Sequence, residues 1–305
     1  MIKVKRKRIL FIVNPTSGKM RIKNYLFGII RNFSDAGYEP LVLMTAKRGD
    51  ATEFARDYSK KVDVIAVCGG DGTLNEAVAG LMQLEKNDRC KLGFIPVGTT
   101  NDLADTLSLP KSPYEASKII LEHEPLPNDV GLFNDERFFN YVASCGAFTA
   151  ASYSTPQNMK NSLGHMAYIL EGIKSLNEIK PIKMKIESKE FSTEGDFLFA
   201  GVTNAMSVGG IYKFDPKFVC LDDGVFEVML VRSPKNPADM VDLLYRLSNK
   251  DFDEKQVKFF KSADITFSFD SKVDWTVDGE YAGASDHINI KNIPAAVEIF
   301  KPAKK

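Results

Sequence analysis

Cysteine and histidine are scarce in this chain. Its 305 residues include four cysteines and three histidines. No two cysteines have the Cys-x-x-Cys spacing, and no histidine is placed to complete a zinc site with them. The sequence therefore predicts neither a disulfide framework nor a zinc centre. The thiols are expected to be reduced and mostly buried, as in a cytoplasmic protein.

Long apolar runs are also missing. The first run, Ile9 to Val13, is ended by Asn14 and Pro15, which makes it too short for the apolar core of a signal peptide. No stretch approaches the roughly 18 consecutive apolar residues that suggest a membrane-spanning helix. We expect a soluble, cytoplasmic protein.

The sequence has no surplus of charge of either sign. Lysine and arginine total 40, as do aspartate and glutamate, so the formal net charge is zero. This balance argues against a chain that is drawn to nucleic acid by its overall charge. The basic stretch from Lys3 to Arg8 is a local exception. It is either a solvated lead-in to the first strand or a patch that contacts a membrane surface or a nucleic acid.

Glycine, in contrast, is present where apolar strands end. Three β-like runs, RILFIVN, VDVIAVC and KLGFIPV, lead directly into the polar turns PTSGK, GGDGT and GTTND. Helix-like stretches lie between them. Apolar strands that alternate with helices predict a parallel sheet covered on both faces, a doubly wound α/β fold. The three turns should then face one cleft at the carboxyl edge of the sheet.

These turns favour a phosphate ligand. Glycine lets backbone N–H groups approach an anion closely, and a helix start adds unpaired donors and the positive end of a dipole. Hydroxyl groups stand at the same level on Thr16, Ser17, Thr73, Thr99 and Thr100. Neither the P-loop pattern nor the dinucleotide-binding fingerprint fits the spacing, so we expect phosphate binding by another arrangement.

Asp71 is the unexpected member of the central turn. A carboxylate beside phosphates repels them unless a cation lies between, and Mg²⁺ held by one or two carboxylates and the substrate phosphates would remove the conflict. The alternative is that Gly70, Asp71 and Gly72 form a tight turn in which the aspartate is only a turn former.

The second half of the chain has a different pattern. After Pro127 the segments alternate or are rich in β-branched and aromatic residues, with a hairpin expected at Asn134 and Asp135. Helix-like segments over residues 162–179 and 237–250 interrupt the strands. This pattern predicts an antiparallel sandwich or barrel-like second domain, with the active site in the cleft between the two domains.

Three acidic positions in this half are open to two interpretations. Asp223 in LDDG and Asp278 in VDGE each precede a glycine, which is the ordinary signal for a hairpin turn, and Asp129 lies near Gly131 at the expected domain boundary. Taken alone, Asp223 and Asp278 are more typical of turns than of functional sites, and Asp129 is equally ambiguous.

Together, the motifs resemble those of one family. The chain contains NPTSGK, CGGDGTLNE, IPVGTTNDLA, LDDGVFEV and VDGEY in this order. In this combination it resembles the bacterial soluble diacylglycerol kinases, which belong to a lipid-kinase group with the sphingosine and ceramide kinases. The GGDGT turn alone is less specific, since NAD kinases and phosphofructokinases carry related turns.

The resemblance implies a fold of the class α/β plus all-β. A doubly wound nucleotide-binding domain would occupy residues 1–128, and an antiparallel β-sandwich that accepts the lipid would occupy residues 129–291. A last strand at about 292–303 would return to the first domain.

The resemblance also implies roles for individual residues. Asp278 matches the general base that takes the proton of the lipid hydroxyl, with Glu280 as the alternative candidate. Asp71 and Asp129 match carboxylates that organise a catalytic Mg²⁺ through water. A second, structural Mg²⁺ site would consist of Asp223 and the backbone carbonyls of Cys220 and Val225. The positions matched to ATP binding are Asn14, Pro15, Thr16, Ser17, Gly18, Thr45, Gly69, Gly70, Asp71, Gly72, Thr73, Leu74, Asn75, Thr99, Asn101 and Asp102.

The implied function is ATP-dependent phosphorylation of diacylglycerol to phosphatidic acid. Because the lipid lies in a membrane, the enzyme would act transiently at its inner face. Docking through Lys3 to Arg8 and through Met- and Phe-bearing loops of the second domain would suit this. A homodimer is compatible with the resemblance. Two alternatives stay open: a kinase of another lipid or of NAD, and a nucleotide-binding regulator without turnover. The presence of Asp278 argues against the regulator.

Overall fold

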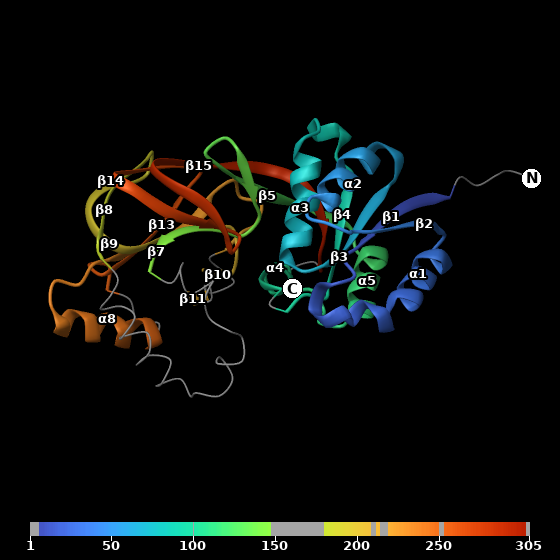
Figure 1. Cartoon of the computed structure of the whole chain (residues 1–305), viewed down its shortest axis with the longest axis horizontal. Coiled ribbons are helices and arrows are strands. Elements are labelled where there is room, and N and C mark those ends of the chain that lie inside the picture. Colours follow the sequence, from blue (N-terminus) through green and yellow to red (C-terminus); the bar gives the residue numbers. More distant parts are fainter. Residues whose placement is uncertain are drawn as a thin grey trace, which may run out of the picture.

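The chain folds into two lobes joined by its longest strand, as Figure 1 shows. The computed structural model describes residues 6–99, 101–147, 180–208, 212–213, 219–249 and 253–302. The helix expected over residues 162–179, the residues from Lys3 to Lys5, and Thr100 lie outside these ranges.

The first lobe contains a parallel sheet in the order β2-β1-β3-β4. Its strands are apolar because helices cover both faces, and every residue of β3 is buried. The strands are β1 (Lys7–Val13), β2 (Tyr38–Met44), β3 (Val64–Gly69) and β4 (Lys91–Pro96).

Helices cover this sheet in two layers. Ile9 and Phe11 of β1 pack in one cluster with residues of α1 and α5, whereas Leu10 and Ile12 pack in another with residues of α2 and α3. This alternation along one strand confirms the predicted doubly wound fold. The α-helices are α1 (Leu26–Asp35), α2 (Asp50–Tyr58), α3 (Asp71–Met82), α4 (Asp102–Thr106) and α5 (Pro113–Glu122). Short 3₁₀ helices are η1 (Ser17–Asn24), η2 (Ser59–Lys61) and η3 (Lys86–Asp88).

The second lobe is antiparallel and folds on itself. Strand β14 pairs with both β7 and β8, and these two strands both pair with β9, so the lobe encloses its own core. The only tryptophan of the chain, Trp275, is wholly buried there against Phe133, Phe267 and Phe269. The predicted β-sandwich class is confirmed.

The elements of this lobe include one helix within the described residues, α8, which the sequence predicted. They are β5 (Pro125–Phe133), β6 (Arg137–Phe139), β7 (Val142–Gly146), β8 (Ile182–Ser188), β9 (Ser192–Thr203), β10 (Ser207–Val208), β11 (Tyr212–Lys213), β12 (Phe226–Arg232), α8 (Pro237–Asn249), β13 (Val257–Ser262), β14 (Asp264–Val277) and β15 (Glu280–Phe300).

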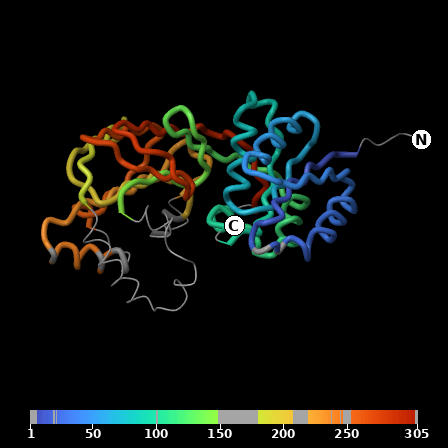
Figure 2. Tube along the Cα trace, viewed as in Figure 1, coloured from blue at the N-terminus to red at the C-terminus, as the bar shows by residue number. Residues whose placement is uncertain are grey.

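Strand β15 belongs to both lobes. It pairs with β14 at its start, with β5 along its length, and in parallel with β4 through Ile299 and Leu92 near its end. The chain trace in Figure 2 follows this strand from one lobe into the other. The hydrogen-bonded sheet is therefore continuous between the lobes. None of the helices in the described ranges is long and apolar enough to cross a membrane.

Candidate active site

A cavity of about 800 Å³ is lined by residues of both lobes. The first lobe contributes the loops at the carboxyl ends of its parallel strands, and the second contributes the β5–β6 hairpin and the turn between β14 and β15. The sequence-predicted residues that line it are Asn14, Thr16, Ser17, Thr45, Gly70, Gly72, Thr73, Asn75, Asp278 and Glu280.

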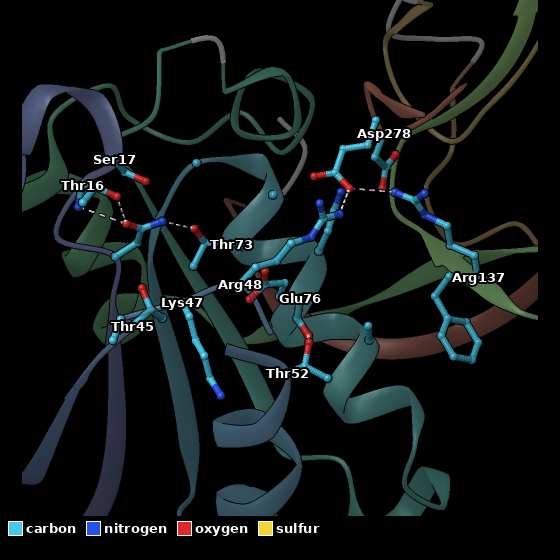
Figure 3. Close-up of a pocket in the computed structure, with 18 of the residues that line it drawn as sticks. Thr16, Ser17, Thr45, Lys47, Arg48, Thr52, Thr73, Glu76, Arg137 and Asp278 are labelled. Carbon is cyan, nitrogen blue, oxygen red and sulfur yellow. Dashed lines mark hydrogen bonds and ion pairs between the residues drawn. The ribbon is translucent and has the colours of Figure 1, made fainter. Parts of the chain in front are cut away.

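The first two glycine turns are joined by Asn14. Its side-chain amide donates to Thr73 Oγ1 at 3.0 Å, and its Oδ1 accepts from the backbone N–H and the hydroxyl of Thr16 at 3.0 and 2.9 Å. Figure 3 shows these side chains at one end of the cavity, with Ser17 and Thr45 near them. The hydroxyl donors are thus fixed side by side at the end of the sheet.

Helix α3 begins in this cavity. Its cap residue is Gly70, and no side chain makes a capping hydrogen bond there. A Cβ at Gly72 would meet no other atom within 4 Å, so the helix start faces open space. Unpaired N–H groups beside open space are the arrangement that binds phosphate.

The third turn does not line this cavity, contrary to the expectation of a single cleft. A Cβ on Gly98 would lie only 2.7 Å from Gly70 Cα, because the two turns pack backbone against backbone. Thr99 and Asn101 line a separate hollow of about 170 Å³. The second turn thus lies between the third turn and the main cavity.

Asp71 caps a neighbouring helix. Its carboxylate accepts from the backbone N–H groups of Asp102 and Leu103, at 3.1 and 3.2 Å, at the start of α4. The turn interpretation therefore has direct support. Burial nevertheless raises the pKa of Asp71, and the charge of Asp102 adds to this, against those two hydrogen bonds. A carboxylate short of positive charge next to a phosphate cradle fits a Mg²⁺ ligand.

Asp278 lies in the turn between β14 and β15, and it is also part of the cavity wall. Its φ of 49° and that of Gly279, 77°, make the expected hairpin turn. The carboxylate accepts three backbone N–H groups, those of Asn140, Tyr141 and Val142, at 2.8 to 3.0 Å. One residue thus satisfies both interpretations that the sequence left open.

The Asp278 carboxyl is suited to accept a proton near neutral pH. Burial raises its pKa to about 6, although the three backbone hydrogen bonds and Arg137 lower it. Two of the hydrogen bonds go to Oδ1 and one to Oδ2, so Oδ2 keeps a lone pair for another partner. A general base needs such a free lone pair and a pKa near the working pH.

Glu280, the alternative base, is engaged by two arginines. Its Oε2 accepts from Arg137 at 2.9 Å and forms an ion pair with Arg48 of the first lobe. Figure 3 shows the side chains of Arg48 and Arg137 extending towards each other near Asp278. Its Oε2 is thus already occupied by two guanidinium groups, whereas Asp278 Oδ2 keeps a free lone pair.

A pair of asparagines also joins the two lobes. The Asn140 side-chain amide donates to Asn75 Oδ1 of α3, and the Asn140 backbone N–H donates to Asp278. Asn140 is buried. The helix that follows the GGDGT turn is therefore connected to the proposed base by two consecutive hydrogen bonds.

Asp129 and the LDDG segment lie apart from the cavity lining. The wholly buried Asp129 accepts from the backbone N–H groups of Gly224 and Ala295, both at 2.7 Å. Both of its oxygens thus fix loops of the second lobe, and burial raises its pKa. These contacts do not fit a Mg²⁺ site at the cavity, so that role stays a prediction.

The second Mg²⁺ site is a poor fit to the residues present. Asp223 Oδ2 accepts from Lys261 Nζ at 3.0 Å, and the same ammonium lies 3.1 Å from Oε1 of the buried Glu227. Lysine thus supplies the positive charge that a metal would supply. Within the described residues, no three side chains of histidine, cysteine, aspartate or glutamate form a group that could hold a metal. We derive no role for a metal at Cys220, Asp223 and Val225.

The remaining predicted ATP residues differ in exposure. Leu74 lies in the hydrophobic core, so its side chain does not reach the cavity, and Gly69 is the buried end of β3. Pro15, Gly18 and Asp102 are not among the lining residues. Residues that line the cavity but were not anticipated are Ala46, Lys47, Arg48, Thr52, Glu76, Ala79, Gln83, Glu136, Arg137 and Phe138.

The comparisons with known proteins agree with this architecture. Residues 8–133 match the family model of the diacylglycerol kinase catalytic domain, and residues 142–301 match the YegS C-terminal NAD kinase beta sandwich-like domain. A diacylglycerol kinase of Staphylococcus aureus (strain MRSA252) is 36% identical over 301 residues, which cover 97% of this chain and 93% of that protein. The chain belongs to the diacylglycerol kinase family.

Other members of the diacylglycerol kinase family are similar over nearly their whole length. A diacylglycerol kinase of Bacillus subtilis (strain 168) is 34% identical over 283 residues, which cover 92% of this chain and 91% of that protein. A crystal structure of a diacylglycerol kinase from Bacillus anthracis str. Sterne matches with a TM-score of 0.77 at 25% identity and covers 98% of both chains. The family resemblance inferred from the motifs is confirmed.

Proposed function

We propose that this family member transfers the γ-phosphoryl group of ATP to the hydroxyl group of diacylglycerol, giving phosphatidic acid. The observation that carries the proposal is one cavity with a phosphate cradle on one side and a buried carboxylate with a pKa of about 6 on the other. Phosphoryl transfer needs positioned phosphates, charge stabilisation and a proton acceptor, and the cavity offers all three.

The phosphates would lie against the start of α3. Gly70, Gly72 and Thr73 of this helix start line that part of the cavity together with Thr16. Asp71 lies at the same helix start but outside the cavity lining, and it would hold Mg²⁺ through water. Mg²⁺ bound with the nucleotide neutralises charge on the phosphates. The helix dipole favours negative charge at the same place.

Asp278 would orient and deprotonate the acceptor. Its free Oδ2 lone pair would accept a hydrogen bond from the acceptor hydroxyl, and it would take the proton as the new phosphorus–oxygen bond forms. Asn140 and Arg137 hold the hairpin that carries Asp278, since Arg137 donates to the backbone carbonyls of Tyr281 and Val277. The base is therefore fixed before the substrate binds.

The acceptor is identified by a panel of compounds. Wild-type protein with γ-labelled ATP and Mg²⁺ would be offered diacylglycerol in mixed micelles, sphingosine and NAD. We expect the label in phosphatidic acid. NAD belongs in the panel because the second domain matches a NAD kinase-like family model. Label in NADP alone, or in no product, would contradict the proposal.

Docking to a membrane is part of this proposal. Met20 and Phe27 present large apolar side chains to solvent, at 59% and 80% exposure, on adjoining helical segments. Such residues suit a peripheral enzyme that collects its substrate from a bilayer. Binding to vesicles that contain an anionic lipid tests this. Replacing Lys3 to Arg8 by neutral residues should weaken binding, and unchanged binding would exclude the basic stretch as a docking element.

A further inference from the structure

Arg48 extends from the first lobe towards the acceptor side of the cavity. It lies between β2 and α2, and its guanidinium forms an ion pair with Glu280 of the second lobe. Figure 3 shows its side chain directed away from Lys47 and towards Asp278 and Arg137. A positive charge therefore stands between the phosphate cradle and the proposed base.

The two arginines on Glu280 are held differently. Arg137 donates to the Tyr281 carbonyl at 3.1 Å, the Val277 carbonyl at 3.4 Å and the Glu280 carboxylate at 2.9 Å. Arg48 is 77% exposed, and within the described residues its guanidinium contacts only Glu280. Arg137 is thus a fixed part of the hairpin, whereas Arg48 can leave Glu280 without leaving that carboxylate unpaired.

The charges that line the cavity favour movement of the Arg48 guanidinium away from Glu280 when a nucleotide binds. The basic side chains that line it are Lys47, Arg48 and Arg137, whereas the acidic ones are Glu76, Glu136, Asp278 and Glu280. A nucleotide triphosphate entering this cavity adds further negative charge. The exposed guanidinium is the group that can turn to the phosphates at the lowest cost, because it is already largely solvated.

We propose that Arg48 is a further catalytic residue, whose guanidinium exchanges Glu280 for the transferring phosphoryl group. This inference rests on the proposed function. In the step, the bond from the γ-phosphorus to the bridging oxygen of ADP breaks and the bond from the acceptor oxygen to phosphorus forms. The acceptor proton goes to Asp278, and ADP leaves with the bonding electrons. Arg48 stabilises the charge on the three equatorial oxygens, which its planar fork of donors matches.

The test compares Arg48→Ala with wild type in kcat, in KM for ATP, and in binding of ADP with and without aluminium fluoride, which mimics the planar phosphoryl group. We expect kcat to fall on the order of 10²-fold, as for loss of a transition-state donor. Binding of ADP alone should not change, while the gain in affinity from aluminium fluoride should be lost. Arg31→Ala, which removes an equally exposed arginine and its ion pair with Asp35, is the matched control.

Other outcomes separate this inference from the proposed function. An unchanged kcat in Arg48→Ala, a rise in KM alone, or an undiminished aluminium fluoride effect would overturn the role of Arg48 while wild type still phosphorylates the lipid. A wild-type protein that phosphorylates no lipid would overturn both. Unfolding midpoints of both variants should equal that of wild type, since Arg31 and Arg48 are exposed.

Discussion

At the scale of single residues, Asp278 combines a turn and an acid–base site. The φ of 49° fits the hairpin, and the three accepted N–H groups fix the carboxylate. Burial is the largest influence on its pKa and moves it to about 6. The residue that makes the tight turn is thus also the proposed base for phosphoryl transfer.

The pH dependence of turnover should follow this group. We expect kcat/KM for the lipid to rise with pH through about 6 and then level off, because only the ionised carboxylate accepts a proton. The profile would be measured between about pH 4.5 and about 8.5, which extends to both sides of the expected midpoint. Glu280→Gln should keep this midpoint. A midpoint that disappears in Glu280→Gln would assign the base to Glu280 instead.

The raised pKa of Asp278 also affects the stability of the fold. Since the folded pKa of about 6 lies above the ordinary 3.8, folded Asp278 binds more protons than the unfolded chain between these values. The contribution of this group to stability is therefore complete below pH 3.8 and is lost as the pH rises through about 6. The proposed base is kept ionised at neutral pH at a cost in stability.

A substitution at Gly72 should distinguish an effect on folding from an effect on ligand binding. A Cβ there meets no other atom within 4 Å, and alanine is favoured over glycine in a helix by roughly 0.5–1 kcal/mol. We expect Gly72→Ala to fold at least as stably as wild type but to raise KM for ATP, because the methyl group enters the space of the phosphates. Thermal unfolding and steady-state kinetics measure the two effects. An unchanged KM would place the phosphates elsewhere.

Gly98→Ala is the contrasting variant. Its Cβ would lie 2.7 Å from Gly70 Cα and 2.6 Å from Asn101 Oδ1, so the two turns would have to separate. We expect a loss of stability of about 1–3 kcal/mol, the usual cost of overpacking. A glycine that faces ligand space and a glycine that faces protein should therefore respond in opposite directions.

At the scale of elements, one lysine lies between two carboxylates in the second lobe. Strand β13 carries Lys261, whose ammonium pairs with Asp223 and with Glu227 of β12. Burial raises the pKa of Glu227 to about 7, against the effect of Lys261. Lys261 thus lowers a pKa that burial alone would raise further.

Removing that lysine should destabilise the fold. Lys261→Met leaves Glu227 buried and unpaired, and we expect a loss of about 1–3 kcal/mol in denaturant unfolding at pH 8. Lys291→Met is the control, because Lys291 has the same 41% exposure but pairs with the exposed Asp135. Chelation with EDTA should not change wild-type unfolding. Equal stability of Lys261→Met and wild type would refute this account.

The elements also show what the sequence could and could not predict. Strand-to-glycine transitions are local signals, so the doubly wound sheet, the GGDGT cradle and the Asn134 hairpin were predictable from the chain alone. The turn at Asp278 is likewise a local signal. That Asp278 and Gly72 line the same cavity depends on how the lobes pack. Arg48, Asn140 and Lys261 act through partners more than 30 residues away, and no spacing rule indicates such pairs.

The prediction of one shared cleft was wrong for a similar reason. The three strands do end at one edge, but Gly98 packs on Gly70, and Asp71 caps α4 instead of facing the cavity. The sequence could place the third turn at the right edge of the sheet. The direction in which the turn faces depends on backbone contacts between loops.

At the scale of the whole molecule, the lobes are coupled by backbone as well as by side chains. Strand β15 pairs with β14, β5 and β4, and the contact of Asn75 with Asn140 crosses from one lobe to the other. A base on one lobe and a phosphate cradle on the other can therefore keep a constant separation.

This coupling predicts cooperative unfolding. Since the end of β15 completes the parallel sheet of the first lobe, neither lobe can lose this strand without disturbing the other. We expect a single calorimetric transition with equal calorimetric and van't Hoff enthalpies. Two resolved transitions would show that the lobes unfold independently.

The most direct test of the central claim is phosphatidic acid formation by variants of Asp278. Asp278→Ala removes the carboxylate, whereas Asp278→Asn keeps its size and an oxygen that can accept the backbone N–H groups of Tyr141 and Val142, though not that of Asn140. We expect both to lose about 10²- to 10⁴-fold in kcat, the usual contribution of a general base, while Glu280→Ala loses much less. Formation of phosphatidic acid at the wild-type rate by folded Asp278→Asn would contradict the account.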